Sequence, residues 1–92
     1  SNEEKYLQMY SYACLGISNM LSDKKFKYYD RYDGYFAFIY YKAIAGWYIG
    51  KKEESIRLFT ELYNNPKNNL SERYKNNIKN NLLNLNIITD DE

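Results

Sequence analysis

The fold is indicated by a short stretch near the middle of the chain, which reads Tyr40-Tyr41-Lys42-Ala43-Ile44-Ala45-Gly46. A similar stretch stands about thirty residues earlier and reads Tyr10-Ser11-Tyr12-Ala13-Cys14-Leu15-Gly16. Both place tyrosine, alanine and glycine at the same offsets, and each is followed by a break and a second run of apolar residues at helical spacing. Self-similarity at such a period is typical of repeated helical hairpins.

Apolar residues recur at helical spacing in five segments of the chain. They predict helices over about 3–21, 22–31, 35–49, 53–63 and 70–86. Asp33-Gly34 provides a turn, Gly50 ends the third helix in the left-handed region, and Pro66 stops the fourth. Asn69 is expected to cap the fifth helix, with Glu72 completing a capping box. No sustained alternation of apolar and polar residues predicts a strand.

These elements predict an all-α domain of two antiparallel helical hairpins and a C-terminal capping helix. We expect the hairpins at about 3–32 and 34–65 and the capping helix at about 70–86, in a single domain over residues 1–92. The chain starts Ser1-Asn2 without a methionine, so we expect it to be a fragment of a longer protein.

Composition excludes several classes of function. The chain has no histidine and a lone cysteine, Cys14, which reads as a packing residue on its helix, so we expect no catalytic residues, no cofactor and no metal site. The net charge of +1 gives no argument for nucleic acid, and no apolar run is long enough to span a membrane. A single cysteine also fits a reducing compartment, and we expect a cytoplasmic protein.

The second hairpin resembles a tetratricopeptide repeat. Gly50 falls at the turn between the helices, Ala43 and Ser55 fall where that family has small residues, and Phe59 falls on the aromatic position of the second helix. The chain departs from the family pattern at other positions, among them Ile39 in place of the common tryptophan. The resemblance implies a right-handed stack of hairpins whose first helices line a concave groove for a partner.

The groove positions that the resemblance implies include large apolar and aromatic residues on the two first helices. We select five of them as candidate partner-binding residues: Tyr10, Tyr40, Ile44, Trp47 and Tyr48. Four of these lie on the side of the third helix opposite Ile39, Ala43 and Gly46. Two apolar faces on one helix indicate either a helix buried twice or a core face plus a binding face. The second possibility leaves the groove open, whereas the first has the fifth helix covering these residues.

Three functions follow as expectations. The leading one is a non-catalytic module that binds a protein, a peptide or a neighbouring domain. The second rests on a further resemblance, to the helical tails of family 2 glycosyltransferases, carried by the stretches 31–48 and 74–82. It implies an accessory domain that packs on or extends a catalytic domain. A third expectation is the peptide-sensing part of a regulator. The twelve tyrosines fit either AT-rich codon usage or selection for aromatic contacts.

Overall fold

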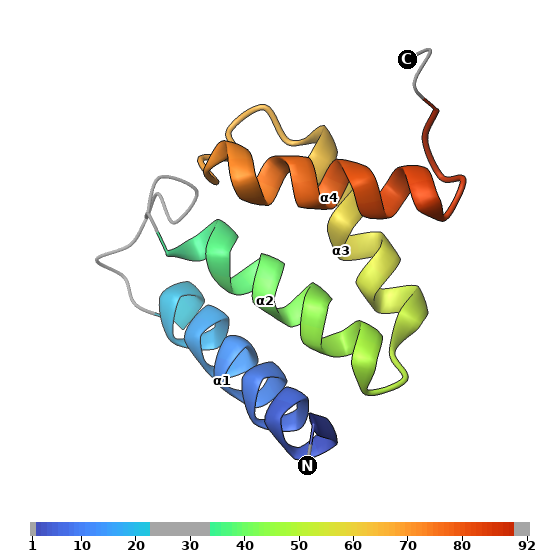
Figure 1. Ribbon diagram of the computed structural model, residues 1–92. Coiled ribbons are helices and arrows are strands. Elements are labelled where there is room, and N and C mark those ends of the chain that lie inside the picture. Colours follow the sequence, from blue (N-terminus) through green and yellow to red (C-terminus); the bar gives the residue numbers. More distant parts are fainter. Residues whose placement is uncertain (1, 23–33, 90–92) are drawn as a thin grey trace.

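The computed structural model describes residues 2–22 and 34–89, and these residues form helices and no strand, so the all-α prediction is confirmed. The helices are α1 (Asn2–Ser22), α2 (Tyr35–Tyr48), α3 (Lys52–Asn64) and α4 (Glu72–Asn84) (Figure 1). The short helix expected at about 22–31 lies outside the described residues beyond Ser22. None of the described helices combines the length and the apolar character needed to cross a membrane.

Helix α2 lies at the centre of the fold, with the other described helices packed around it (Figure 1). Helix α1 runs antiparallel to it, because Tyr6 stacks on Tyr48 near one end while Gly16 lies against Phe38 near the other. Three ring atoms of Phe38 lie 2.7–2.9 Å from the place where a Cβ atom on residue 16 would stand, so a larger residue there would force the Phe38 ring to shift.

The hairpin of α2 and α3 has the close crossing that its small residues predict. Ala43 and Ser55 are both fully buried, and the Ser55 hydroxyl donates a hydrogen bond of 2.6 Å to the Ala43 carbonyl. Gly50 follows α2 with a φ of +91°, and the Lys51 amide donates to the Gly46 carbonyl at 2.8 Å, which closes the helix end. The predicted stop at Gly50 is therefore confirmed.

Helix α4 covers the side of α2 that α1 and α3 leave open, and it runs in the same direction as α2. Tyr40 contacts Tyr74 near the start of α4, while Ile44 and Trp47 share a pocket with Asn81, which lies further along α4. The resulting core joins residues of α2, α3, α4 and the loop before α4, and its buried members are Phe36, Tyr40, Ala43, Leu58, Phe59, Leu62, Leu70, Ile78 and Leu82.

The stacking of whole repeats differs from the expected arrangement. The tetratricopeptide alignment makes α1 and α2 equivalent helices, and equivalent helices in a stack are related by a small rotation, so they run in nearly the same direction. Here α1 and α2 run in opposite directions and pack directly on each other (Figure 1). The expected stacking of equivalent helices is therefore not what the described residues form.

The start of α4 also differs from the expectation. The helix begins at Glu72 with Ser71 as its N-cap, and no side chain caps it, so the predicted capping box of Asn69 and Glu72 is wrong. The reason lies in Leu70, which is buried in the core and holds the chain in a loop up to that point. The Asn68 side chain supports this loop by donating to the Leu62 carbonyl and accepting from the Leu70 amide, each at 2.9 Å.

We expect Ala43→Leu to destabilise the fold, because the larger side chain overpacks the crossing of α2 and α3. Overpacking a tight core typically costs about 1–3 kcal/mol of unfolding free energy. Chemical denaturation followed by circular dichroism measures this loss. Ala37→Leu is the matched control, since Ala37 is only partly buried at the edge of the same core. Equal stability of Ala43→Leu and the unmodified chain would contradict the crossing described here.

Candidate functional site

A pocket lies between the C-terminal halves of α2 and α4. The ribbons of these two helices diverge toward their C-terminal ends (Figure 1). Its volume is about 180 Å³. Three helices contribute to its walls, and the lining residues are Ile44, Trp47, Tyr48, Phe59, Asn81, Asn84 and Leu85. A helix pair that diverges cannot interlock side chains at its open end, and this accounts for the space.

Local sequence places each wall of the pocket. Ile44 and Trp47 lie one turn apart on α2, and Trp47 and Tyr48 are the last two residues of that helix. Asn81, Asn84 and Leu85 follow the same spacing at the end of α4, so they point to one side. Phe59 reaches the pocket from α3 and is buried in the core beneath it.

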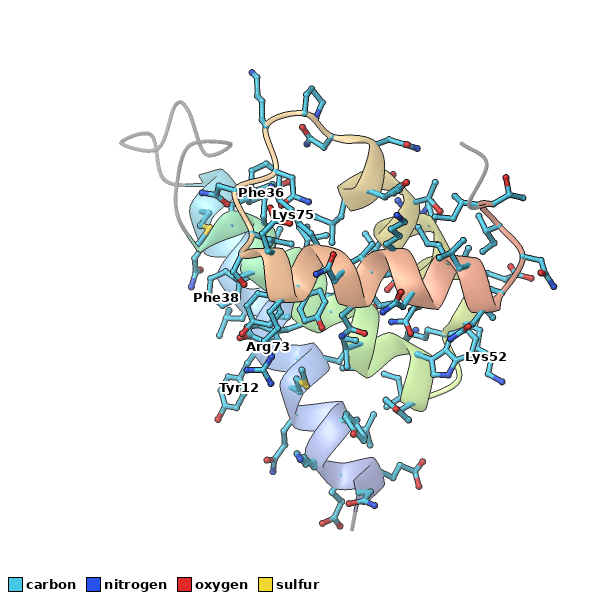
Figure 2. The ribbon with its side chains drawn as sticks, turned by 45° about the horizontal axis from the view of Figure 1, so that its top comes forward. Tyr12, Phe36, Phe38, Lys52, Arg73 and Lys75 are labelled. Atoms are coloured by element: carbon cyan, nitrogen blue, oxygen red, sulfur yellow. The ribbon has the colours of Figure 1, made fainter. Side chains whose placement is uncertain are left out.

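A positive charge stands beside the aromatic wall. The Nζ atom of Lys52 lies 5.0 Å from the centre of the Trp47 ring, within the range of a cation–π contact. Lys52 is the first residue of α3 and is exposed, as Figure 2 shows. Its ammonium group can therefore pair with a carboxylate on a molecule seated against Trp47.

Tyr48 extends the aromatic wall onto α1. Its side chain is 59% exposed, yet its ring stacks on Tyr6 with the ring centres 4.3 Å apart and the planes inclined by 15°. Stacking holds both rings in place, so they form a fixed apolar surface next to the pocket.

The structure brings together three of the five candidate residues, namely Ile44, Trp47 and Tyr48. Tyr40 is only 6% exposed and belongs to the core. Its ring lies against Tyr74, and its hydroxyl accepts a hydrogen bond from the Asn77 side chain. Tyr40 is therefore buried beneath α4 and is not exposed in an open groove.

Tyr10 lies elsewhere, at the junction of α1 with the turn between α2 and α3. Its hydroxyl donates to Oε1 of Glu54 at 2.5 Å, and the Nζ atoms of Lys42 and Lys51 lie 5.7 Å and 5.6 Å from its ring centre. Burial raises the pKa of the Tyr10 phenol well above its usual range, and the hydrogen bond to Glu54 raises it further. These contacts bind α1 to the central hairpin, and Tyr10 does not line the pocket.

The sequence reasoning missed four pocket residues: Phe59, Asn81, Asn84 and Leu85. None of the four is among the five candidate residues chosen from the sequence. The signal present in the sequence is the spacing of positions 81, 84 and 85, which places amides beside an apolar residue. The spacing alone does not predict which other helix packs against these three positions.

The chemistry of the pocket is that of recognition. Asparagine amides both donate and accept hydrogen bonds, and the aromatic rings offer apolar surface with polar tips. The described residues hold no group of three histidine, cysteine or acidic side chains placed to bind a metal ion. Comparison with protein-family models, curated proteins and solved structures gives no match for this chain. The proposals below therefore rest on the geometry of the site.

We expect stability to fall at alkaline pH in a way that depends on Tyr10. Its pKa is raised in the folded state, so the unfolded chain loses the phenolic proton first as the pH rises above about 10. The stabilisation is thus complete below pH 10 and is lost progressively above it. Urea denaturation from pH 8 to 11 should show a shallower decline for Tyr10→Phe than for the unmodified chain. Parallel declines would show that Tyr10 is not buried against Glu54.

Trp47 should behave as a half-buried pocket wall. Acrylamide is expected to quench its fluorescence in the folded chain, although less than in urea-unfolded chain, because the ring is partly exposed. Trp47→Ala should destabilise the fold by less than the roughly 3–5 kcal/mol typical of removing a buried aromatic side chain. Phe36→Ala is the control for full burial, since Phe36 is 2% exposed. A tryptophan that acrylamide does not reach would mean that the pocket is closed.

Proposed function

We propose that this chain is a non-catalytic protein-interaction module, which binds a peptide segment by seating one apolar side chain in the pocket between α2 and α4. The observation that carries the proposal is the pocket itself, with Trp47 as one wall and Asn81 and Asn84 opposite. Tryptophan and tyrosine at such a site are typical binding anchors, because they bury a large area with few rotatable bonds.

The size and polarity of the pocket favour a peptide over a free small molecule. Its volume of about 180 Å³ is below the roughly 300–1,000 Å³ of sites that enclose a drug-sized ligand, but it is adequate for a single side chain. The amides of Asn81 and Asn84 suit the alternating donors and acceptors of a peptide backbone. Lys52 beside Trp47 adds a preference for a nearby carboxylate.

An accessory role beside a glycosyltransferase catalytic domain is the second candidate function. Leu7 and Leu15 on α1 are 47% and 57% exposed, which supports contact of α1 with a neighbouring domain of any kind. Apolar side chains on an outer helix are suited to packing against a neighbouring domain. In this arrangement α1 forms the domain contact, and the pocket at α4 remains free for a peptide.

The test is selection of binders from a random dodecapeptide library, followed by titration of individual peptides with Trp47 fluorescence as the signal. We expect Trp47→Ala to weaken binding by about 2 kcal/mol or more, roughly thirty-fold in Kd, which is the scale of an interface hot spot. Titrations of this variant are followed by calorimetry, since it lacks the fluorophore.

Tyr63→Ala provides the control, because Tyr63 is an exposed aromatic residue of α3 that does not line this pocket. It should bind the selected peptides with unchanged affinity. Circular dichroism must show that both variants remain folded. Selected peptides that bind Trp47→Ala as tightly as the unmodified chain would place the binding site elsewhere and refute the proposal.

A further inference from the structure

A second pocket lies between α4 and the loop 65–71, which joins α3 to α4. It shares no lining residue with the pocket at Trp47. Its volume is about 340 Å³, which is inside the roughly 300–1,000 Å³ range of sites that bind small molecules. Helix α4 contributes Lys75, Asn76, Ile78 and Lys79 to the lining. The pocket is thus large enough for a ligand of its own.

Two lysines give this pocket a positive charge. Lys75 and Lys79 are four residues apart on α4, so they lie on one face of the helix with their Cβ atoms about 5–6 Å apart. Lys75 is half-buried beside the loop that leads into α4 (Figure 2). Neither lysine forms a salt bridge with another residue of the ranges 2–22 and 34–89, and no carboxylate lines the pocket. Both ammonium groups can therefore serve a bound anion.

The hydrogen-bonding groups on the loop side of the pocket also favour an anion. The Oδ1 atom of Asn65 accepts from the Lys67 amide, and that of Asn68 accepts from the Leu70 amide, each at 2.9 Å. Both oxygens are therefore directed to the backbone of the loop. The pocket then offers a ligand mainly donors, from amide and ammonium groups. Such a set suits a ligand that is rich in acceptor oxygens.

Apolar and aromatic side chains make up the rest of the lining. Tyr63 comes from the end of α3 and Pro66 from the loop, while Ile78 is only 1% exposed and belongs to the core. The face of an aromatic ring favours contact with another flat ring. A ligand with such a ring can lie against these side chains while its charged group reaches the lysines. An inorganic ion leaves this apolar surface uncovered.

We infer that this pocket binds a small organic phosphate, namely a phosphomonoester on a group that carries a ring. A phosphomonoester has a charge of about −1.5 to −2 at pH 7 and three acceptor oxygens. It therefore matches two ammonium groups flanked by amide donors, and lysine is a common ligand for phosphate. A carboxylate or a sulfate ester carries a single charge and neutralises only one of the two lysines. The inference goes beyond the proposed function and does not depend on the pocket at Trp47.

The probe is phenyl phosphate, titrated against the full chain and followed by calorimetry and by backbone amide shifts in NMR spectra. Phenyl sulfate keeps the ring with one charge, and inorganic phosphate keeps the phosphate without the ring. We expect phenyl phosphate to bind at least tenfold more tightly than either one, and to shift the amide signals of Tyr63, Lys75 and Lys79. Inorganic phosphate of equal affinity would mean an adventitious ion only, and phenyl sulfate of equal affinity would refute the match to a dianion.

The charge of the ligand gives an independent readout. The second pKa of a phosphomonoester is about 6, so lowering the pH from about 7.5 to about 5.5 removes most of its second charge. The Kd of phenyl phosphate should then approach that of phenyl sulfate. The chain has no histidine whose titration would mimic this effect. A constant ratio of the two affinities over this range would contradict recognition of the dianion.

Lys75→Gln and Lys79→Gln should each weaken phenyl phosphate about tenfold, because each removes one of the two charges. Lys5→Gln is the matched control, since Lys5 is an exposed lysine of α1 that does not line the pocket. Its Kd should equal that of the unmodified chain. Lys79 is exposed, so its replacement keeps the test valid even if Lys75→Gln fails to fold by circular dichroism. Unchanged affinity in a folded Lys75→Gln or Lys79→Gln variant, or an equal loss in Lys5→Gln, would overturn the inference.

Discussion

The fold depends on the burial of helix α2, whose side chains are apolar on several sides. Helix α2 contains a single charged residue, Lys42, and its apolar and aromatic side chains point in all directions. A helix that is apolar all round must be buried. Helices α1 and α3 pack directly on α2, and α4 covers a further side of it through the contacts of Tyr74 and Asn77 with Tyr40. The other helices are thus arranged around α2 (Figure 1). The pocket at Trp47 lies where this cover is incomplete.

The sequence was sufficient to predict the parts of the fold that depend on local chemistry. Gly50 and Pro66 end helices for backbone reasons that act within a few residues, and Ala43 and Ser55 are small because two backbones cross there. The start of α4 was not predictable in this way. Asn69 and Ser71 are both good N-caps, and the choice between them is made by Leu70, whose burial in the core is a tertiary effect.

In the candidate site, too, features that depend on local spacing could be predicted and features that depend on tertiary packing could not. Helical spacing correctly grouped Ile44, Trp47 and Tyr48, because residues on one helix share a face whatever surrounds it. Spacing could not show that α4 lies over Tyr40 while diverging from Trp47, since that depends on the angle between two helices. For the same reason the hydrogen bond from the Asn77 amide to the Tyr40 hydroxyl, and the places of Asn81 and Asn84 in the pocket, could not be predicted.

Tyrosine serves two physical purposes in this chain, whatever the origin of its abundance. At partly buried positions its hydroxyl finds a partner, as in the pairs of Tyr10 with Glu54 and of Tyr41 with Tyr74. These bonds allow large aromatic rings at helix junctions without leaving a buried polar atom unpaired. At exposed positions such as Tyr12 and Tyr48 the same residue offers apolar area with a polar tip.

The composition of α4 links the pocket to the stability of the fold. Asparagine is a mediocre helix former, and α4 has five among its thirteen residues, so this helix is held by docking through Ile78 and Leu82 more than by its own propensity. Its C-terminal half is the part that diverges from α2. On the proposed function, a peptide segment seated between Trp47 and Leu85 would fill that gap and contact both helices. Its binding would then be coupled to the docking of α4 and would stabilise the domain by mass action.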